Sequence, residues 1–127
     1  MLLYFINNKE FYSDGDDEKV IAVLKNQLHI IDPEFCNLKI YPSDQSVTVN
    51  KKKIYLCLRD PKTRNFYPLE VLIYVTLHEI AHIKSKSYSS KSHNEEFYKN
   101  FEELLNKTIS KGVLLKNIHI PENYCQR

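Results

Sequence analysis

The chain has 127 residues, of which 43% are hydrophobic and 27% are charged, and its formal net charge at pH 7 is +2. This composition is typical of a globular protein and excludes an intrinsically disordered chain. A charge so close to zero also excludes a strongly electrostatic nucleic-acid binder, and no apolar run is long enough to cross a membrane. We expect residues 1–127 to form a single domain with one hydrophobic core.

The N-terminal segment begins with a short apolar run, Leu2–Ile6, which predicts a strand. It lacks the basic flank and the small-residue cleavage site of a secretory signal peptide, so we expect an intracellular protein, in the cytoplasm or the nucleus, that is not secreted. The acidic turn Asp14–Asp17 supplies capping oxygens for a helix of about 14 residues, which Asp32-Pro33 ends. Apolar residues at helical spacing form the core side of this helix: Val20, Ile21, Leu24, Leu28 and Ile31.

Three short strands are predicted between this helix and the middle of the chain. Leu38–Tyr41 and Val47–Val49 are the first two, and Ile54–Leu58, which alternates and is rich in β-forming residues, is the third. The three lysines Lys51–Lys53 form the turn before the third strand, and we interpret them as solvated charges. A polar connection, Arg59–Tyr67, then leads into the next helix.

The most informative motif is H-E-I-A-H at residues 78–82, near the end of an apolar segment that predicts a helix over residues 68–84. With 3.6 residues per turn, the two histidines lie one above the other and can bind the same Zn²⁺ ion. Glu79 lies beside that face, where a carboxylate can accept a proton from a metal-bound water. The alternative is a helix that holds two ordinary histidines. It is disfavoured because the helix is apolar on nearly every side, and buried polar groups need partners.

A second helix is predicted after a serine- and lysine-rich connection. Ser92 and Glu95 have the spacing of a capping box, which places His93 in the first turn, and Gly112 ends the helix. We predict His93 as the third metal ligand, because the connection is long enough for this helix to fold back at little entropic cost. Three protein ligands leave the fourth zinc position open for water. Two alternatives remain, an exposed helix-start role for His93 and ligation by Glu96. The core side of the helix consists of Phe97, Phe101, Leu104, Leu105 and Ile109.

The three cysteines, Cys36, Cys57 and Cys125, are widely spaced and form no C-x-x-C pair. We interpret them as reduced thiols of an intracellular protein and exclude a structural zinc ribbon. The chain is expected to end in one strand, which includes His119, and a loose tail.

Residues 54–105 resemble the catalytic core of the WLM-domain and SprT-like zinc metallopeptidases. The matching sequences are IYLCLRDP, YVTLHEIAHI and SHNEEFYKNFEELL. The resemblance implies an α+β fold with a compact zincin-like core, in which a small sheet packs on the N-terminal helix, the HExxH helix and a following helix. It also implies zinc ligands at His78, His82 and His93 and a catalytic glutamate at Glu79.

We therefore expect a zinc metalloprotease that binds one Zn²⁺ ion and hydrolyses peptide bonds with a water activated by Glu79. The expected partners are protein or peptide substrates, with no membrane, and the expected state is a monomer. The resemblance adds DNA-associated or DNA-crosslinked proteins as substrates, together with a weak association with DNA. Two alternatives are a zinc-stabilised protein- or DNA-binding module with weak or no hydrolysis, and a zinc hydrolase of another amide. Side chains that can donate a hydrogen bond to an oxyanion are Arg59, Tyr74, Tyr88 and Tyr124.

Overall fold

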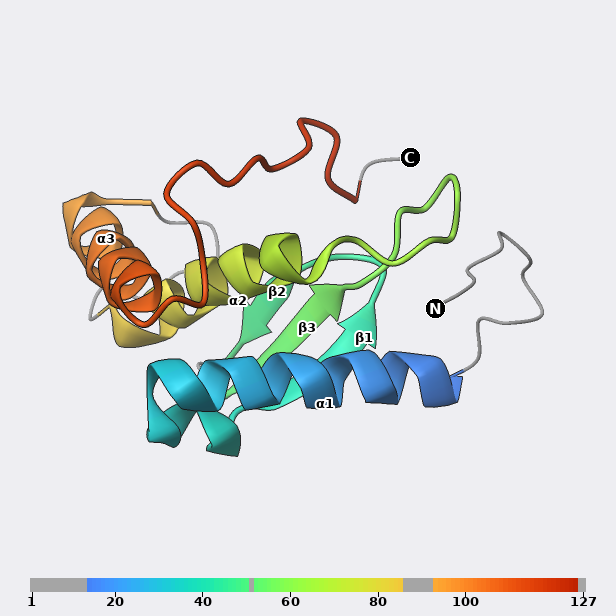
Figure 1. Ribbon diagram of the computed structural model, residues 1–127, viewed down its shortest axis with the longest axis horizontal. Coiled ribbons are helices and arrows are strands. Elements are labelled where there is room, and N and C mark those ends of the chain that lie inside the picture. The colour runs from blue at the N-terminus through green and yellow to red at the C-terminus, as the bar shows by residue number, and fades with distance from the viewer. Residues whose placement is uncertain (1–13, 51, 86–92, 126–127) are drawn as a thin grey trace.

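The computed structural model describes residues 14–50, 52–85 and 93–125. In these ranges the elements are α1 (Asp14–Ile31), the short 3₁₀ helix η2 (Pro33–Asn37), β1 (Lys39–Ser43), β2 (Val47–Val49), β3 (Lys53–Cys57), α2 (Leu69–Lys84) and α3 (Glu95–Ser110). The fold is α+β with a small sheet and helices, as predicted (Figure 1). The predicted strand Leu2–Ile6 lies outside the described residues.

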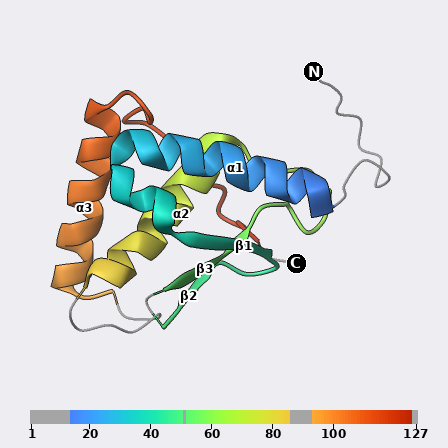
Figure 2. The same cartoon turned by 90° about the horizontal axis from the view of Figure 1, so that it is seen from below.

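The sheet is mixed and has the strand order β1-β3-β2. β1 pairs with β3 in parallel, with Ile40 opposite Ile54, and β2 pairs with β3 in antiparallel fashion, with Thr48 also opposite Ile54. Figures 1 and 2 show that α1 and α2 lie on the same face of the sheet. In this arrangement α1 packs against β1, α2 packs against β2 and β3, and α3 packs against α2.

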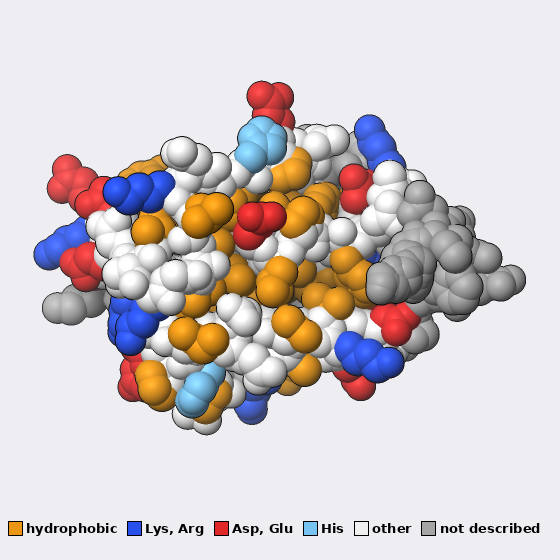
Figure 3. Space-filling view, viewed as in Figure 1, with side chains coloured by type: hydrophobic (Ala, Val, Ile, Leu, Met, Phe, Trp, Pro, Cys, Tyr) orange, Lys and Arg blue, Asp and Glu red, His pale blue; other side chains and the backbone are white. Residues whose placement is uncertain are grey.

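The hydrophobic core lies between the sheet and the helices. Its most deeply buried apolar side chains include Leu24, Leu28, Ile54, Leu56, Leu72 and Leu77. Complete burial of each such side chain contributes about 1.5–3 kcal/mol. The apolar segment over residues 68–84, which predicts α2, is buried on nearly every side, as expected, because the sheet, α1 and α3 all contact α2. On the face that carries α1, α2 and the C-terminal segment, hydrophobic side chains gather along the middle, where an acidic side chain lies among them, and most charged side chains lie around the margin (Figure 3).

The helix ends differ from the predictions in two places. The segment Asp14–Asp17 is not a turn before α1 but its first turn, where the negative charges of Asp16 and Asp17 interact favourably with the helix dipole. The N-cap of α3 is Asn94, whose side chain accepts a hydrogen bond from the backbone N–H of Phe97 at 2.9 Å. His93 therefore precedes the helix instead of lying in its first turn, and Ser92 lies outside the described residues.

Two predicted helix ends are confirmed. α1 ends at Ile31, and Asp32 then caps η2 by accepting a hydrogen bond from the backbone of Glu34 at 3.0 Å. At the end of α3, Gly112 has φ +76°, a left-handed conformation that glycine adopts without a steric cost. Its N–H and that of Val113 bond backward into the last turn of the helix, as in a Schellman motif.

The prediction of three reduced thiols is wrong for two of the cysteines. Cys57, at the end of β3, and Cys125, near the end of the chain, form a disulfide, whereas Cys36 is free and exposed. The partners are 68 positions apart in sequence, so their spacing gives no sign of the pairing. The predicted C-terminal strand is also wrong: between residues 113 and 125 the described chain forms turns and irregular structure, with His119 exposed.

None of the helices in the described ranges is both long and apolar enough to span a membrane.

Candidate metal centre

The three predicted ligands, His78, His82 and His93, lie together in the structure. One ring nitrogen from each lies within 4.8 Å of the others, a grouping that could hold a metal ion. His78 and His82 are one turn apart on α2, as their spacing predicts, and His93 joins them from the residue before the N-cap of α3. The ring centroid of His78 is 5.0 Å from both others, and those of His82 and His93 are 5.1 Å apart.

The imidazole of His82 provides a test of whether a metal fits this cluster. His82 is only 1% exposed, and its Nε2 atom is buried without a hydrogen-bond partner among the described residues. A buried polar atom left without a partner costs about 1–3 kcal/mol. A metal ion would satisfy the lone pair, and neutral imidazole nitrogen is a preferred zinc ligand. The residues therefore fit a metal.

The environment of His82 favours its neutral, metal-binding form. Burial lowers the pKa of His82, and the nearby His78 and His93 shift it in the same direction, while Glu79 opposes them. His78 is half-buried and His93 is exposed, so the cluster reaches from the interior to solvent. This is the arrangement that a site open to a substrate requires.

Phe97 forms an apolar floor beneath the three rings. Its ring centroid lies 5.0 Å from that of His78, 4.4 Å from His82 and 4.7 Å from His93. The sequence predicted Phe97 only as a core residue of α3. The signal for this additional contact was its closeness in sequence, since Phe97 follows His93 by four residues and lies in the first turn of α3.

Glu79, the predicted general base, is 4% exposed and is held at both carboxylate oxygens. Oε1 accepts a hydrogen bond from the hydroxyl of Thr48 at 2.7 Å, and Oε2 lies 3.1 Å from Nδ1 of His78. A carboxylate can only accept, so Nδ1 of His78 is the donor and Nε2 keeps the lone pair that binds a metal. Carboxylates commonly orient metal-binding histidines in this way. Thr48 was not predicted as a site residue.

Glu96, the alternative ligand, does not join the histidine cluster in the described part of the chain.

Four side chains were predicted to donate to an oxyanion. Tyr74 lies one turn before His78 on α2, and its ring centroid is 5.2 Å from that of Phe101. Phe101 also packs on His78. Tyr88 lies outside the described residues.

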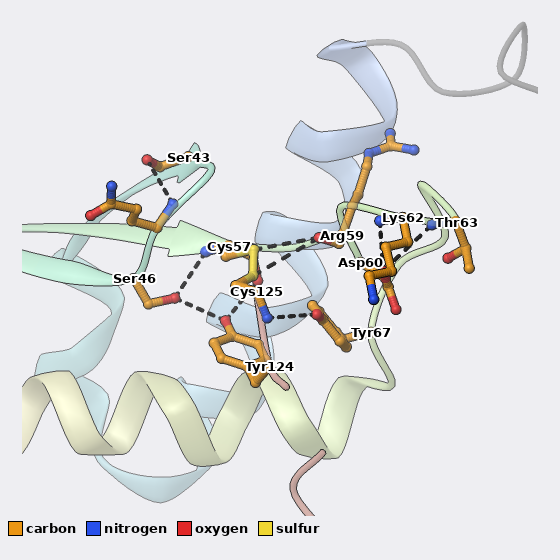
Figure 4. The surroundings of a disulfide bond; sticks show 11 residues. Ser43, Ser46, Cys57, Arg59, Asp60, Lys62, Thr63, Tyr67, Tyr124 and Cys125 are labelled. Atoms are coloured by element: carbon orange, nitrogen blue, oxygen red, sulfur yellow. Dashed lines mark hydrogen bonds between the residues drawn. A yellow bond between two sulfur atoms is a disulfide. The ribbon is translucent and has the colours of Figure 1, made fainter. Parts of the chain in front are cut away.

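The other two oxyanion candidates, Arg59 and Tyr124, lie near the disulfide between Cys57 and Cys125 (Figure 4). Arg59 forms an ion pair with Asp17 at 2.9 Å and lies over the ring of Phe66 at 4.0 Å. The hydroxyl of Tyr124 donates to the backbone carbonyl of Cys57 at 2.7 Å, and burial raises the pKa of Tyr124. These contacts give both side chains a structural role.

Comparison with known proteins places these residues in a family. The WLM domain matches residues 40–116, more than half of the chain, and this range contains all of the sheet except Lys39, together with α2, α3, the three histidines and Glu79. In Invertebrate iridescent virus 6, the uncharacterized protein 136R is 38% identical over 90 residues, which are 69% of this chain and 49% of the relative. In Invertebrate iridescent virus 3, the uncharacterized protein 042R is 35% identical over 91 residues, which are 72% of this chain and 55% of the relative.

A third relative, the uncharacterized protein R325 of Acanthamoeba polyphaga mimivirus, is 38% identical over 84 residues, 63% of this chain and 41% of the relative. The chain thus spans about half the length of the curated relatives that it matches. No solved structure matches the chain. The matched domain shows that the chain belongs to the WLM-domain family, which is associated with metallopeptidase-like proteins and with a metal cofactor.

Proposed function

We propose that the protein is a zinc-dependent metallopeptidase, with His78, His82 and His93 as metal ligands and Glu79 as general base. The observation that carries the proposal is the buried Nε2 atom of His82, which has no partner among the described residues and lies inside a cluster of three histidines, beside a buried carboxylate. Three histidines leave one zinc position open, which is typical of catalytic sites and not of structural ones. Membership of the WLM-domain family supports the same activity.

The proposed reaction assigns one role to each group of residues. A bound zinc ion would polarise the scissile carbonyl and lower the pKa of its water to about 7. Glu79 accepts the proton of the attacking water and then delivers it to the leaving amine. His78, hydrogen-bonded to Glu79 through Nδ1, keeps the orientation that metal binding requires. Phe97 excludes water beneath the cluster, which strengthens the electrostatic interactions there.

The position of β2 supports an extended peptide as the substrate. In the described part of the chain β2 has β3 on one side only, and its residue Thr48 contacts Glu79. A peptide that pairs with an exposed strand edge gains main-chain hydrogen bonds along its length. A substrate paired with β2 would therefore run past the proposed base.

Glu79→Gln tests this function because it removes the base and keeps the shape. With the zinc-loaded protein and an unfolded protein as substrate, we expect an unchanged zinc content and a cleavage rate lower by about 10²–10⁴-fold. Glu96→Gln is the matched control, and it should cleave within about twofold of the wild type, because Glu96 is outside the cluster. Undiminished turnover by Glu79→Gln would refute the general-base role.

The same assay examines the substrate class. Cleavage that rises when DNA is added would favour DNA-associated protein substrates. Stable binding of the unfolded protein without cleavage by the wild type would refute the peptidase and favour the binding module.

A further inference from the structure

We propose that Thr48 is the positioning residue for Glu79, which holds the carboxylate of the base in place from the edge strand of the sheet. This inference rests on the proposed function, in which Glu79 is the base. Nothing in the H-E-I-A-H motif identifies Thr48, which is 31 positions away in sequence and lies in a different element.

In β2 the polar residue is buried and the two apolar residues are more exposed, which is the reverse of what their hydrophobicity favours. Thr48 is 2% exposed, whereas its neighbours in the strand are a half-buried Val47 and a Val49 that is 37% exposed. Burying a hydroxyl without a hydrogen bond costs roughly 1–3 kcal/mol, and a valine of the same shape would avoid this cost. A threonine at the buried position of a Val-Thr-Val strand therefore needs a partner for its hydroxyl.

That partner is Glu79. The Thr48 hydroxyl lies 2.7 Å from Oε1 and 3.3 Å from the backbone carbonyl oxygen of the same residue. A hydroxyl has one proton, so the shorter, charge-assisted contact to the carboxylate is the dominant one. The longer contact to the carbonyl can only be the weaker branch of a bifurcated hydrogen bond from the same proton. Thr48 therefore fixes the carboxylate of Glu79 relative to the main chain of α2.

This contact has a consequence for catalysis because glutamate has several rotatable bonds. Freezing them during the reaction would add an entropic cost that a preformed hydrogen bond removes in advance. With Oε1 on Thr48 and Oε2 beside His78, the carboxylate is held from both the sheet and the helix. Thr48 belongs to β2, so the base is aligned with the strand edge on which the proposed substrate would lie.

Two substitutions at this position separate the hydroxyl from the side-chain shape. Thr48→Val removes the hydroxyl and keeps the shape, whereas Thr48→Ser keeps the hydroxyl. For the zinc-loaded protein we expect Thr48→Val to lower kcat by about 10–100-fold with KM within about twofold, because a misplaced catalytic group affects the chemical step. Thr48→Ser should keep kcat within about threefold of the wild type. The zinc affinity should change by less than about twofold in both, because the histidines supply the ligands.

Thr108→Val is the matched control. Thr108 is also fully buried, and its hydroxyl donates to the backbone carbonyl of Leu104 at 2.6 Å on α3, away from Glu79. It should lose a similar hydrogen bond and keep its kcat. An equal loss of kcat in both valine variants, or none in Thr48→Val, would overturn the proposal.

A measurement on the metal-free protein tests the same contact without any activity. In a double-mutant cycle, Thr48→Val should lower the melting temperature by several degrees when Glu79 is present, and by less than half as much in a Glu79→Ala background. Thr108→Val should lower it equally in both backgrounds. Equal shifts for Thr48→Val would overturn the proposal even if the enzyme cleaves peptides. Coupling in the cycle together with no peptide cleavage by the wild type would refute the peptidase and leave the contact between Thr48 and Glu79 established.

Discussion

The region around Cys57 and the last turns of α2 differ in how their polar groups are satisfied. Around Cys57, three residues close a ring of partly buried hydrogen bonds: the Cys57 N–H donates to Ser46 Oγ at 3.0 Å, Ser46 Oγ lies 2.8 Å from the Tyr124 hydroxyl, and that hydroxyl donates to the Cys57 carbonyl (Figure 4). In the last turns, Nε2 of His82 is buried with no partner among the described residues. Polar groups that satisfy one another stabilise the fold, whereas a buried nitrogen left unpaired points to a ligand. Four experiments test this contrast.

The largest expected effect is on metal binding. His93→Ala should weaken zinc binding by about 10³-fold or more, because one of three ligands is lost from a binding energy of roughly 10–16 kcal/mol. Isothermal titration calorimetry measures the affinity, and circular dichroism checks the fold. His119→Ala is the matched control, because both histidines are exposed and lie outside helices and strands. Equal affinities in the two variants would remove His93 from the site.

The second effect concerns the disulfide. Replacing both Cys57 and Cys125 by alanine should lower the free energy of unfolding by about 4 kcal/mol, as expected for opening a loop of this length. Urea denaturation measures the change, and the zinc stoichiometry should stay the same. Cys36→Ser, at the free and exposed cysteine, should change little. A reductant should destabilise the wild type and leave the double variant unaffected. Equal sensitivity of both proteins would contradict the disulfide's role.

A smaller loss is expected for Tyr124→Phe. The substitution deletes the hydroxyl that closes the ring and leaves Ser46 and the Cys57 carbonyl with one partner fewer, which should cost about 1–2 kcal/mol. Tyr98→Phe is the control, because Tyr98 is 57% exposed and its hydroxyl can bond to water. Thermal denaturation of the two variants distinguishes them. Equal stabilities would mean that the ring contributes nothing.

The smallest effect is a pH dependence of the metal-free protein. Burial lowers the pKa of His82 below the value of about 6.5 for an unfolded chain, so the unfolded state binds the proton first as the pH falls. The stability from this residue is therefore present above pH 6.5 and is lost below it. Urea denaturation between pH 8 and pH 5.5 should show this decrease, and His82→Gln should reduce its slope. An unchanged slope in the variant would show that another group is responsible.

Much of the fold could be predicted from the sequence because its signals are local. Hydrophobic periodicity predicted α1, a continuous apolar segment predicted α2, alternation predicted the third strand, and Gly112 predicted the end of α3. The three histidines were predicted to meet, because two share a helical face and the third follows a connection long enough to return. These inferences need only a few neighbouring residues at a time.

The features that were missed depend on contacts between distant segments. The disulfide needs Cys125 to be carried back to the end of β3, where the Tyr67 hydroxyl accepts a hydrogen bond from its N–H at 2.8 Å. The contact between Thr48 and Glu79 needs the register of β2 on β3 and the docking of α2. The sequence did contain one indication, a threonine between two valines in a predicted strand. Without a tertiary structure, its hydroxyl had no identifiable partner.

The histidines come from α2 and from the residue before α3, so an ion held among them would add a cross-link between two helices that already pack against each other. Binding to the native state alone stabilises it by about 2.7 kcal/mol when the free ligand is at 100 times its Kd. A shortage of the proposed metal would therefore lower the stability of the folded protein as well as remove the ion from the proposed site. The larger unfolded fraction would then be exposed to proteolysis.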